Sequence, residues 1–194
     1  MDALAEREPL IAGELARVGY PAPRIRERGF ATLLRTIVGQ QVSVAAAASI
    51  WRRLEEAMGD AVAPRALLAL DEADLRAAGL SRQKALYARS LAEHVASGAL
   101  DLVDLPREDE EAIARLSAVH GIGRWSAEIY LMFAEGRPDV WPAGDLAVRE
   151  GLGRILRLDS RPTEGEVRRL GEQWRPHRSA LAIFTWHAYA NPAL

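Results

Sequence analysis

The stretch "VHGIGRWSAE", residues 119–128, places two glycines around one isoleucine and then begins a new helix-like segment. An amphipathic segment with acidic residues at its start comes before it, and helical periodicity after it continues to Gly136. Glycine readily adopts positive φ and has no Cβ, so such a turn can join two helices tightly and let a phosphate approach. N–H groups at the start of the second helix then point toward an anion. The stretch predicts a helix-hairpin-helix, although an ordinary αα-hairpin with glycine caps fits the same residues.

The rest of the chain also shows helical periodicity. Apolar residues recur at spacings of three and four, and Ser, Thr or Asp stand at several helix starts with glycine at the ends. No segment shows a convincing polar–apolar alternation of the kind that predicts a half-buried strand. The pattern therefore predicts an all-α protein of roughly nine to eleven helices.

Composition limits the class of protein. The 194 residues are 49% hydrophobic, and no apolar run approaches the ~20 residues of a membrane span. The absence of cysteine excludes disulfides, cysteine-ligated zinc, iron–sulfur clusters and thiol catalysis. The first ten residues mix acidic and apolar side chains, unlike a signal peptide. We expect a cytoplasmic bacterial protein that does not contact membranes.

The charges give two further limits. A formal net charge of −2 argues against binding nucleic acid by electrostatics alone. Lys84 is the only lysine in the chain, so chemistry that needs a lysine amine has one candidate.

A second pattern follows the hairpin by about twenty residues. The segment "VWPAGDLAV", residues 140–148, is a Pro/Gly loop ending on Asp145, which opens an apolar helix and could be its N-cap. Hairpin, loop and aspartate at this spacing resemble the helix-hairpin-helix superfamily of DNA glycosylases. The similarity to the DNA-3-methyladenine glycosylase II family is carried by "LLRTIVGQQVSVAAAASIW" (33–51), "GLSRQKALYARSLA" (79–92), "VHGIGRWSAEIYLMF" (119–133) and "RPHRSALAIFTW" (175–186).

The resemblance implies a two-lobed, all-α helix-hairpin-helix glycosylase fold with the active-site cleft between the lobes. We expect a single glycosylase domain over 1–194. One lobe is a helical bundle over 30–136, which includes the hairpin at 117–125, and the other combines 1–29 with 137–194. Longer relatives carry an N-terminal β-rich domain, for which the segment before Phe30 has no room, so the chain resembles the short form.

The resemblance also implies roles for the active-site residues. Asp145 matches the catalytic aspartate. Trp125 stands where relatives with lyase activity, such as endonuclease III, carry a lysine nucleophile, which implies a monofunctional enzyme. Trp186 matches an aromatic residue of the base pocket. Tyr130 and Trp141 are weaker candidates for the pocket, because core packing explains an aromatic residue equally well.

The DNA-contacting residues follow from the same resemblance. The loop after Gly39 carries the wedge that fills the gap left by a flipped base, with Gln41 as the candidate and Val42 as the alternative. Carbonyls of Ser117, Val119 and Ile122 match positions that hold a Na⁺ or K⁺ ion when DNA is bound, and we expect no other cofactor. The hairpin residues expected to contact DNA are His120, which replaces the usual proline, Gly121, Ile122, Gly123, Arg124 and Ser126.

We therefore expect a monomeric enzyme of base excision repair that binds double-stranded DNA containing alkylated bases. It would flip an alkylated purine such as 3-methyladenine and hydrolyse its N-glycosidic bond, leaving an abasic site. Three alternatives stay open: a non-catalytic protein that binds alkyl lesions on the same fold, a glycosylase for other damaged bases, and a helical protein–protein module. A pure binder has no need of a carboxylate beside anionic DNA, and a protein–protein module would have no affinity for duplex DNA.

Overall fold

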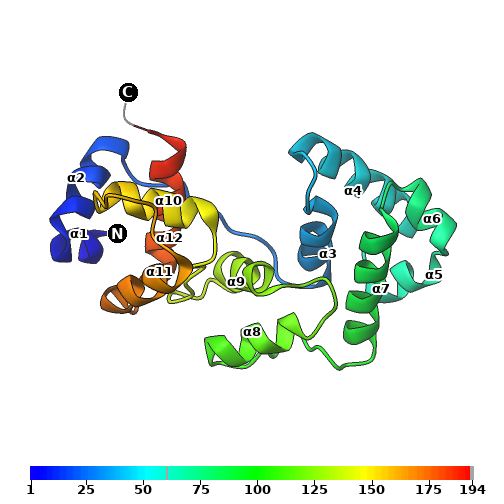
Figure 1. Cartoon of the computed structure of the whole chain (residues 1–194). Helices are drawn as coiled ribbons and strands as arrows, with labels where there is room; N and C mark the ends of the chain where they lie inside the picture. The colour runs from blue at the N-terminus through cyan, green and yellow to red at the C-terminus, as the bar shows by residue number, and fades with distance from the viewer. Residues whose placement is uncertain (60, 193–194) are drawn as a thin grey trace. The chain divides into compact units, whose positions relative to one another are not determined.

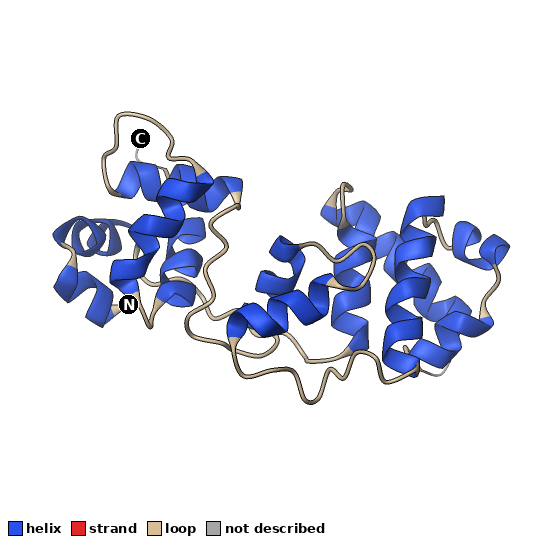
Figure 2. Ribbon diagram, turned by 60° about the horizontal axis from the view of Figure 1, so that its bottom comes forward, coloured by secondary structure: helices blue, strands red, loops and turns tan. Residues whose placement is uncertain are grey.

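The computed structural model describes residues 1–59 and 61–192, which form helices and loops and contain no strand (Figures 1 and 2). The predicted all-α class is confirmed. These residues form twelve α-helices and one 3-10 helix, more than the sequence predicts. The six-residue helices α1 (Asp2–Arg7) and α5 (Pro64–Ala69) are too short to show a helical repeat, which explains part of the difference. No helix in the described ranges is long and apolar enough to cross a membrane.

The chain forms two compact units. One consists of Arg26–Tyr130 and is called the hairpin unit below; the other consists of Met1–Ile25 and Leu131–Leu194 and is called the terminal unit. The division falls inside helix α9 (Arg124–Phe133). The sequence places the lobe boundaries at Phe30 and Gly136, so the observed division lies a few residues before each.

The hairpin unit is built around α7, against which α3, α5 and α6 pack, while α4 packs on α3 (Figure 1). Ser81 caps the start of α7 by accepting the Lys84 N–H, and Gly98, just after its end, has a φ of +78°. The fully buried leucines of this core include Leu33, Leu67 and Leu91. The helices, besides the first part of α9, are α3 (Phe30–Gly39), α4 (Val44–Met58), α5, α6 (Glu72–Ala77), α7 (Arg82–Ala96) and α8 (Asp109–Ser117).

The terminal unit is built on the contact between α10 and α12, and α2 packs against both (Figure 1). The two helices approach closely at Gly151, where a Cβ atom would lie 2.7 Å from Cγ2 of Thr185, so only glycine fits. Leu152 and Phe184 are fully buried beside this contact. The helices are α1, α2 (Pro9–Val18), α10 (Leu146–Ile155), α11 (Glu164–Gly171), the 3-10 helix η1 (Glu172–Trp174), α12 (Arg178–Ala190) and the end of α9.

Candidate active site and nucleic-acid interface

The predicted helix-hairpin-helix is confirmed, since α8 ends at Ser117 and α9 begins at Arg124. The Ile122 N–H donates to the Val119 carbonyl at 3.0 Å, which closes the turn. Gly121 has a φ of +93°, a conformation that glycine adopts without steric cost.

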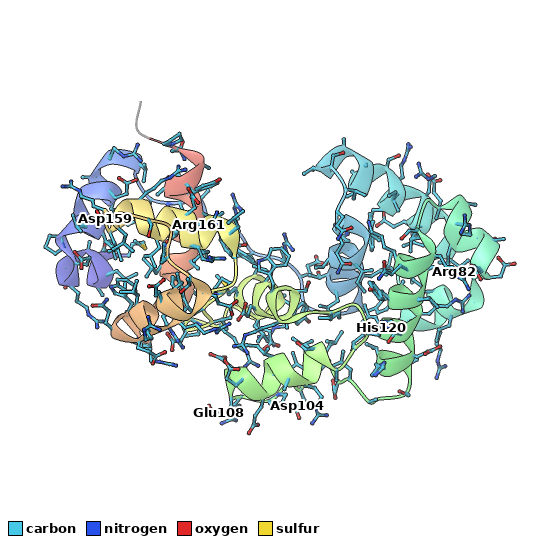
Figure 3. The ribbon with its side chains drawn as sticks, in the orientation of Figure 1. Arg82, Asp104, Glu108, His120, Asp159 and Arg161 are labelled. Atoms are coloured by element: carbon cyan, nitrogen blue, oxygen red, sulfur yellow. The ribbon has the colours of Figure 1, made fainter. Side chains whose placement is uncertain are left out.

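Two side chains from neighbouring elements hold the tip of the hairpin. The ring of Tyr87, on α7, lies so close to Gly121 that a Cβ atom there would be 2.1 Å from Cγ of the tyrosine. The same ring makes an edge-to-face contact with His120, with centroids 4.7 Å apart (His120 is labelled in Figure 3). The Gln40 side-chain amide donates to the Gly121 carbonyl at 3.0 Å. The sequence did not indicate these two roles, because nothing in it shows that α7 and the turn after α3 reach the hairpin.

The expected wedge residues lie in the turn between α3 and α4. Gln41 is exposed and has a φ of +54°, the left-handed region that non-glycine residues adopt at a cost. Val42 is 38% exposed. Both candidates are accessible, and the choice between them stays a prediction.

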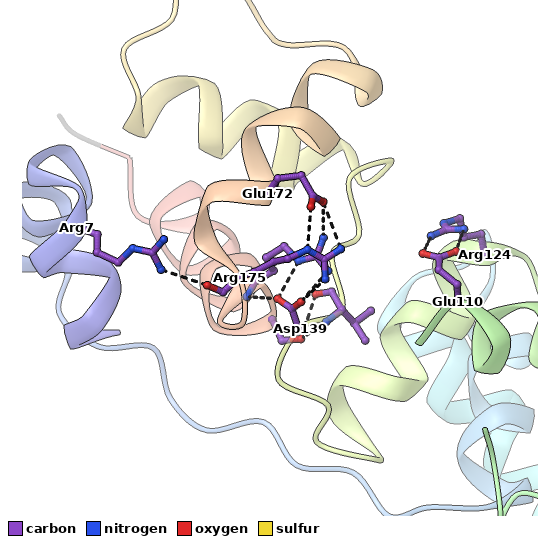
Figure 4. A network of polar contacts seen from close by, with 9 residues as sticks. Arg7, Glu110, Arg124, Asp139, Glu172 and Arg175 are labelled. Carbon is purple, nitrogen blue, oxygen red and sulfur yellow. Dashed lines mark hydrogen bonds and ion pairs between the residues drawn. The ribbon is translucent and has the colours of Figure 1, made fainter. Parts of the chain in front are cut away.

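The other hairpin residues differ in their surroundings. His120 and Gly123 are exposed, whereas Ile122 and Ser126 are buried. Ile122 and Ser126 can therefore contact DNA only through their backbone atoms. Arg124 donates to Glu110 of α8 (Figure 4). It also donates to Glu128 of α9, with its Nε 2.9 Å from the Glu128 carboxylate. The hydrogen bond that Arg124 donates to Glu110 is the main cause that raises the pKa of the Arg124 guanidinium.

The predicted aromatic residues fall into two groups. Trp125 lies on α9 and is 47% exposed. Tyr130 is buried, and its hydroxyl accepts the Gly29 N–H at 2.8 Å. Trp141 is also buried, and its indole N–H donates to the Val167 carbonyl at 2.9 Å. Tyr130 and Trp141 therefore serve the cores of their units, while Trp125 presents its ring on the surface.

Asp145 is the N-cap of α10, as its position after the Pro/Gly loop suggests. Its Oδ1 atom accepts the Val148 N–H at 2.9 Å and also the indole N–H of Trp186 at 2.9 Å. Trp186 lies on α12, is half-buried, and stacks on Phe133 with centroids 5.8 Å apart. The capping role and the contact with a predicted pocket residue thus occur at the same carboxylate oxygen.

The loop that leads to Asp145 is fixed by ion pairs. Both carboxylate oxygens of Asp139 accept hydrogen bonds from the Arg178 guanidinium at 2.9 Å, and Arg175 pairs with the same carboxylate at 2.7 Å (Figure 4). Burial acts to raise the pKa of the Asp139 carboxyl, but the hydrogen bonds and charges of Arg178 and Arg175 outweigh it and lower that pKa. The loop is therefore tied to the first turn of α12.

The resemblance implies a monovalent cation at the hairpin, and oxygen atoms there are compatible with one. The Ser117 hydroxyl oxygen is shielded from solvent and has no hydrogen-bond partner among the residues that the structure describes. The carbonyl of the same residue is the one that the resemblance assigns to the ion. The Val119 carbonyl accepts one N–H and has a second lone pair for a cation. Oxygen donors alone suit a hard cation, so these residues fit Na⁺ or K⁺.

Lys84 has a structural contact in the hairpin unit. Its Nζ atom donates to the carbonyl of Val38, near the end of α3, at 2.8 Å. Burial lowers the pKa of this amine. The contact satisfies one of the carbonyls that the end of a helix leaves without a partner.

Comparison with known proteins assigns the chain to a family. Residues 34–177 match the HhH-GPD superfamily of base excision DNA repair proteins, so the chain belongs to that superfamily. DNA-3-methyladenine glycosylase 1 of Schizosaccharomyces pombe is 33% identical over 165 residues, which are 83% of this chain and 72% of the relative. The resemblance seen in the sequence is thereby confirmed. The chain spans only 57% of another curated relative, from Bacillus subtilis, to which it is 29% identical.

Two solved structures are similar to this fold. A DNA-3-methyladenine glycosidase from Bacillus halodurans is 30% identical with a TM-score of 0.87, and the match covers 95% of this chain and 86% of that one. A 3-methyladenine DNA glycosylase from Schizosaccharomyces pombe, solved in complex with abasic DNA, is 31% identical with a TM-score of 0.75. That match covers 90% of this chain and 88% of the other.

Proposed function

We propose that the protein is a monofunctional DNA glycosylase that removes alkylated purines such as 3-methyladenine from double-stranded DNA. The observation that carries the proposal is the Asp145 carboxylate, held at the start of α10 by two N–H donors. Relatives named for 3-methyladenine support the substrate class, and one of them was solved with abasic DNA, the product expected from this reaction.

The positive charge of an alkylated purine makes its glycosidic bond easier to break. Alkylation at N3 or N7 gives a purine a positive charge and weakens its bond to C1′ of the sugar. When this bond breaks, the base leaves with the electron pair and becomes neutral, while the oxygen of a water molecule bonds to C1′ and a proton is released. The leaving base needs no proton from the enzyme, so the mechanism requires no general acid.

The aspartate acts on the sugar rather than on the base. Positive charge builds at C1′ as the base departs, and the Asp145 carboxylate stabilises that charge. The same group orients the attacking water or accepts its proton. Because the two N–H donors hold Oδ1, the carboxylate needs little rearrangement during the reaction.

The aromatic side chains bind the extruded base. We assign this role first to Trp125, whose ring is exposed and electron-rich, because a cationic base over an aromatic face gains about 0.5–2 kcal/mol. The family resemblance supports Trp186 as a second contact. We leave Tyr130 and Trp141 out of the proposed pocket because both are buried with their polar groups hydrogen-bonded inside the cores.

The hairpin binds the DNA backbone. Its tight turn at Gly121 and the first N–H groups of α9 offer donors to a phosphate. A Na⁺ or K⁺ ion held by Ser117, Val119 and Ile122 would add positive charge there when DNA is bound. Two features favour a purely hydrolytic enzyme: the sequence has Trp125 where relatives with lyase activity carry lysine, and Lys84 is engaged at α3.

The test is to incubate the pure protein with methylated duplex DNA, without added divalent metal or cofactor, and to chromatograph the released material. We expect free 3-methyladenine, with strands that break only after alkali treatment. Asp145→Asn should lower the rate of release by at least about 100-fold, because a charge-stabilising contact in the transition state is lost. The variant should still bind the DNA.

Other outcomes would contradict the proposal in distinct ways. Lesion binding without release by the wild-type protein would favour a non-catalytic binder. Neither binding nor release would remove the nucleic-acid role. Full activity of Asp145→Asn would exclude the assigned catalytic group.

A further inference from the structure

We propose that Trp186 is the positioning residue of the Asp145 carboxylate, acting through its indole N–H in addition to any contact of its ring with the base. This inference rests on the proposed function, because it concerns how the catalytic group is held. The indole Nε1 lies 2.9 Å from Oδ1 of Asp145. Because tryptophan has only this one polar hydrogen, the contact is directional and cannot be replaced by another group of the same side chain.

The hydrogen bond from the Trp186 indole to Asp145 goes beyond what the capping of helix α10 requires. An N-cap aspartate needs only the backbone N–H of the first turn, which Val148 supplies. A second donor to the same oxygen, from a different helix, fixes the oxygen from two directions and limits rotation of the carboxylate. A hydrogen bond to an ionised group is also stronger than one between neutral groups, so the indole N–H holds this carboxylate oxygen firmly.

The indole is itself held in place. Its ring stacks on Phe133 with an angle of 27° between the planes. Trp186 is half-buried, and its neighbours on α12, Phe184 and Thr185, are fully buried in the terminal unit. A donor with so little freedom can fix its acceptor without losing much side-chain entropy.

The same helix also holds the beginning of the loop that carries Asp145. The Ser179 hydroxyl donates to the Val140 carbonyl at 3.1 Å and accepts the Val140 N–H at 3.0 Å. The Ser179 N–H donates to the Pro138 carbonyl at 3.0 Å. Ser179 and Trp186 are seven residues apart, which is about 10 Å along a helix. One rigid element thus fixes both the start of the loop and the carboxylate at its end.

The decisive variant is Trp186→Phe, which keeps an aromatic ring against Phe133 but removes the N–H donor. We expect the single-turnover rate of 3-methyladenine release to fall about 10- to 100-fold, as for loss of a hydrogen bond to a charged group. Affinity for a duplex with a tetrahydrofuran abasic site should stay within about twofold, since the ring and the hairpin remain. The matched control is Trp174→Phe, which shortens a fully buried tryptophan of the same unit and should leave the release rate unchanged.

A spectroscopic measurement tests the contact without relying on activity. The indole N–H of Trp186 gives one cross-peak in a ¹H–¹⁵N spectrum, which is assigned because it disappears in Trp186→Phe. We expect Asp145→Asn to move this peak upfield, because a neutral acceptor polarises the N–H less, and Trp174→Phe to leave it in place.

The results separate the two proposals. If the wild-type protein releases no base but the peak moves as expected, the proposed function fails and the contact stands. If base is released and Trp186→Phe keeps the wild-type rate, or loses DNA affinity in proportion to rate, the positioning role is wrong. A peak that does not respond to Asp145→Asn also overturns it.

Discussion

At the scale of single residues, the two glycines of the hairpin have different structural roles. Gly121 has positive φ and packs against Tyr87, whereas a Cβ atom at Gly123 would meet nothing within 4 Å. We predict that Gly121→Ala destabilises the protein, since left-handed backbone costs alanine about 1–2 kcal/mol and the ring must also move. The melting temperature should fall by about 4 °C or more, as measured by circular dichroism. Gly123→Ala is the matched control, and an equal loss in both variants would show that the contact with Tyr87 is unimportant.

The residue scale also shows what the sequence can and cannot indicate. An aspartate after a Pro/Gly loop predicts an N-cap, and Asp145 is one, because capping depends only on residues three positions apart. The contacts of Trp186 with Asp145 and of Tyr87 with Gly121 join residues far apart in sequence. The sequence favoured Trp125 over Trp141 as a pocket residue, but only the packed structure shows that Trp141 is buried and Trp125 exposed.

At the scale of elements, the attachment of the 137–145 loop to α12 should depend on pH. The pKa of Asp139 is lower in the folded protein than in the unfolded chain, so its stabilising contribution is present above the unfolded pKa of about 3.9. It is lost as pH falls through the folded value. We predict that Asp139→Asn lowers the free energy of unfolding by about 1–3 kcal/mol at pH 7, and that the difference from wild type shrinks below pH 4.

Urea unfolding across this pH range measures the effect, with Glu172→Gln as its control. Glu172 pairs with the same two arginines, but its side chain is 59% exposed, so its removal should lower the free energy of unfolding less than Asp139→Asn does. A difference for Asp139→Asn that stays constant down to pH 2 would contradict the role given to its ionisation.

Helices with a long apolar face and a cap were the elements that the sequence indicated best. The Ser and Thr residues that mark helix starts in the sequence include Ser81, the N-cap of α7, and Thr163, which forms a capping box with Glu166 at the start of α11. The boundary between the two units was harder to predict from the sequence, because it falls within α9, where no glycine or proline interrupts the helical pattern.

At the scale of the whole molecule, the net charge of −2 means that duplex DNA is not attracted by the protein as a whole. Affinity must then come from local features, and the proposed cation at the hairpin is one of them. Its expected oxygen donors, the carbonyls of Ser117, Val119 and Ile122, suit K⁺ but not a large organic cation. We predict that replacing KCl by tetramethylammonium chloride at equal ionic strength weakens binding to abasic duplex by about tenfold, or 1.4 kcal/mol.

Fluorescence anisotropy with a labelled duplex measures this difference, and equal ionic strength keeps the general screening of phosphates the same. Adding a few millimolar K⁺ back should restore the affinity, because a specific site saturates at concentrations that hardly change the screening. Equal affinity in both salts would mean that the hairpin N–H groups alone hold the phosphate.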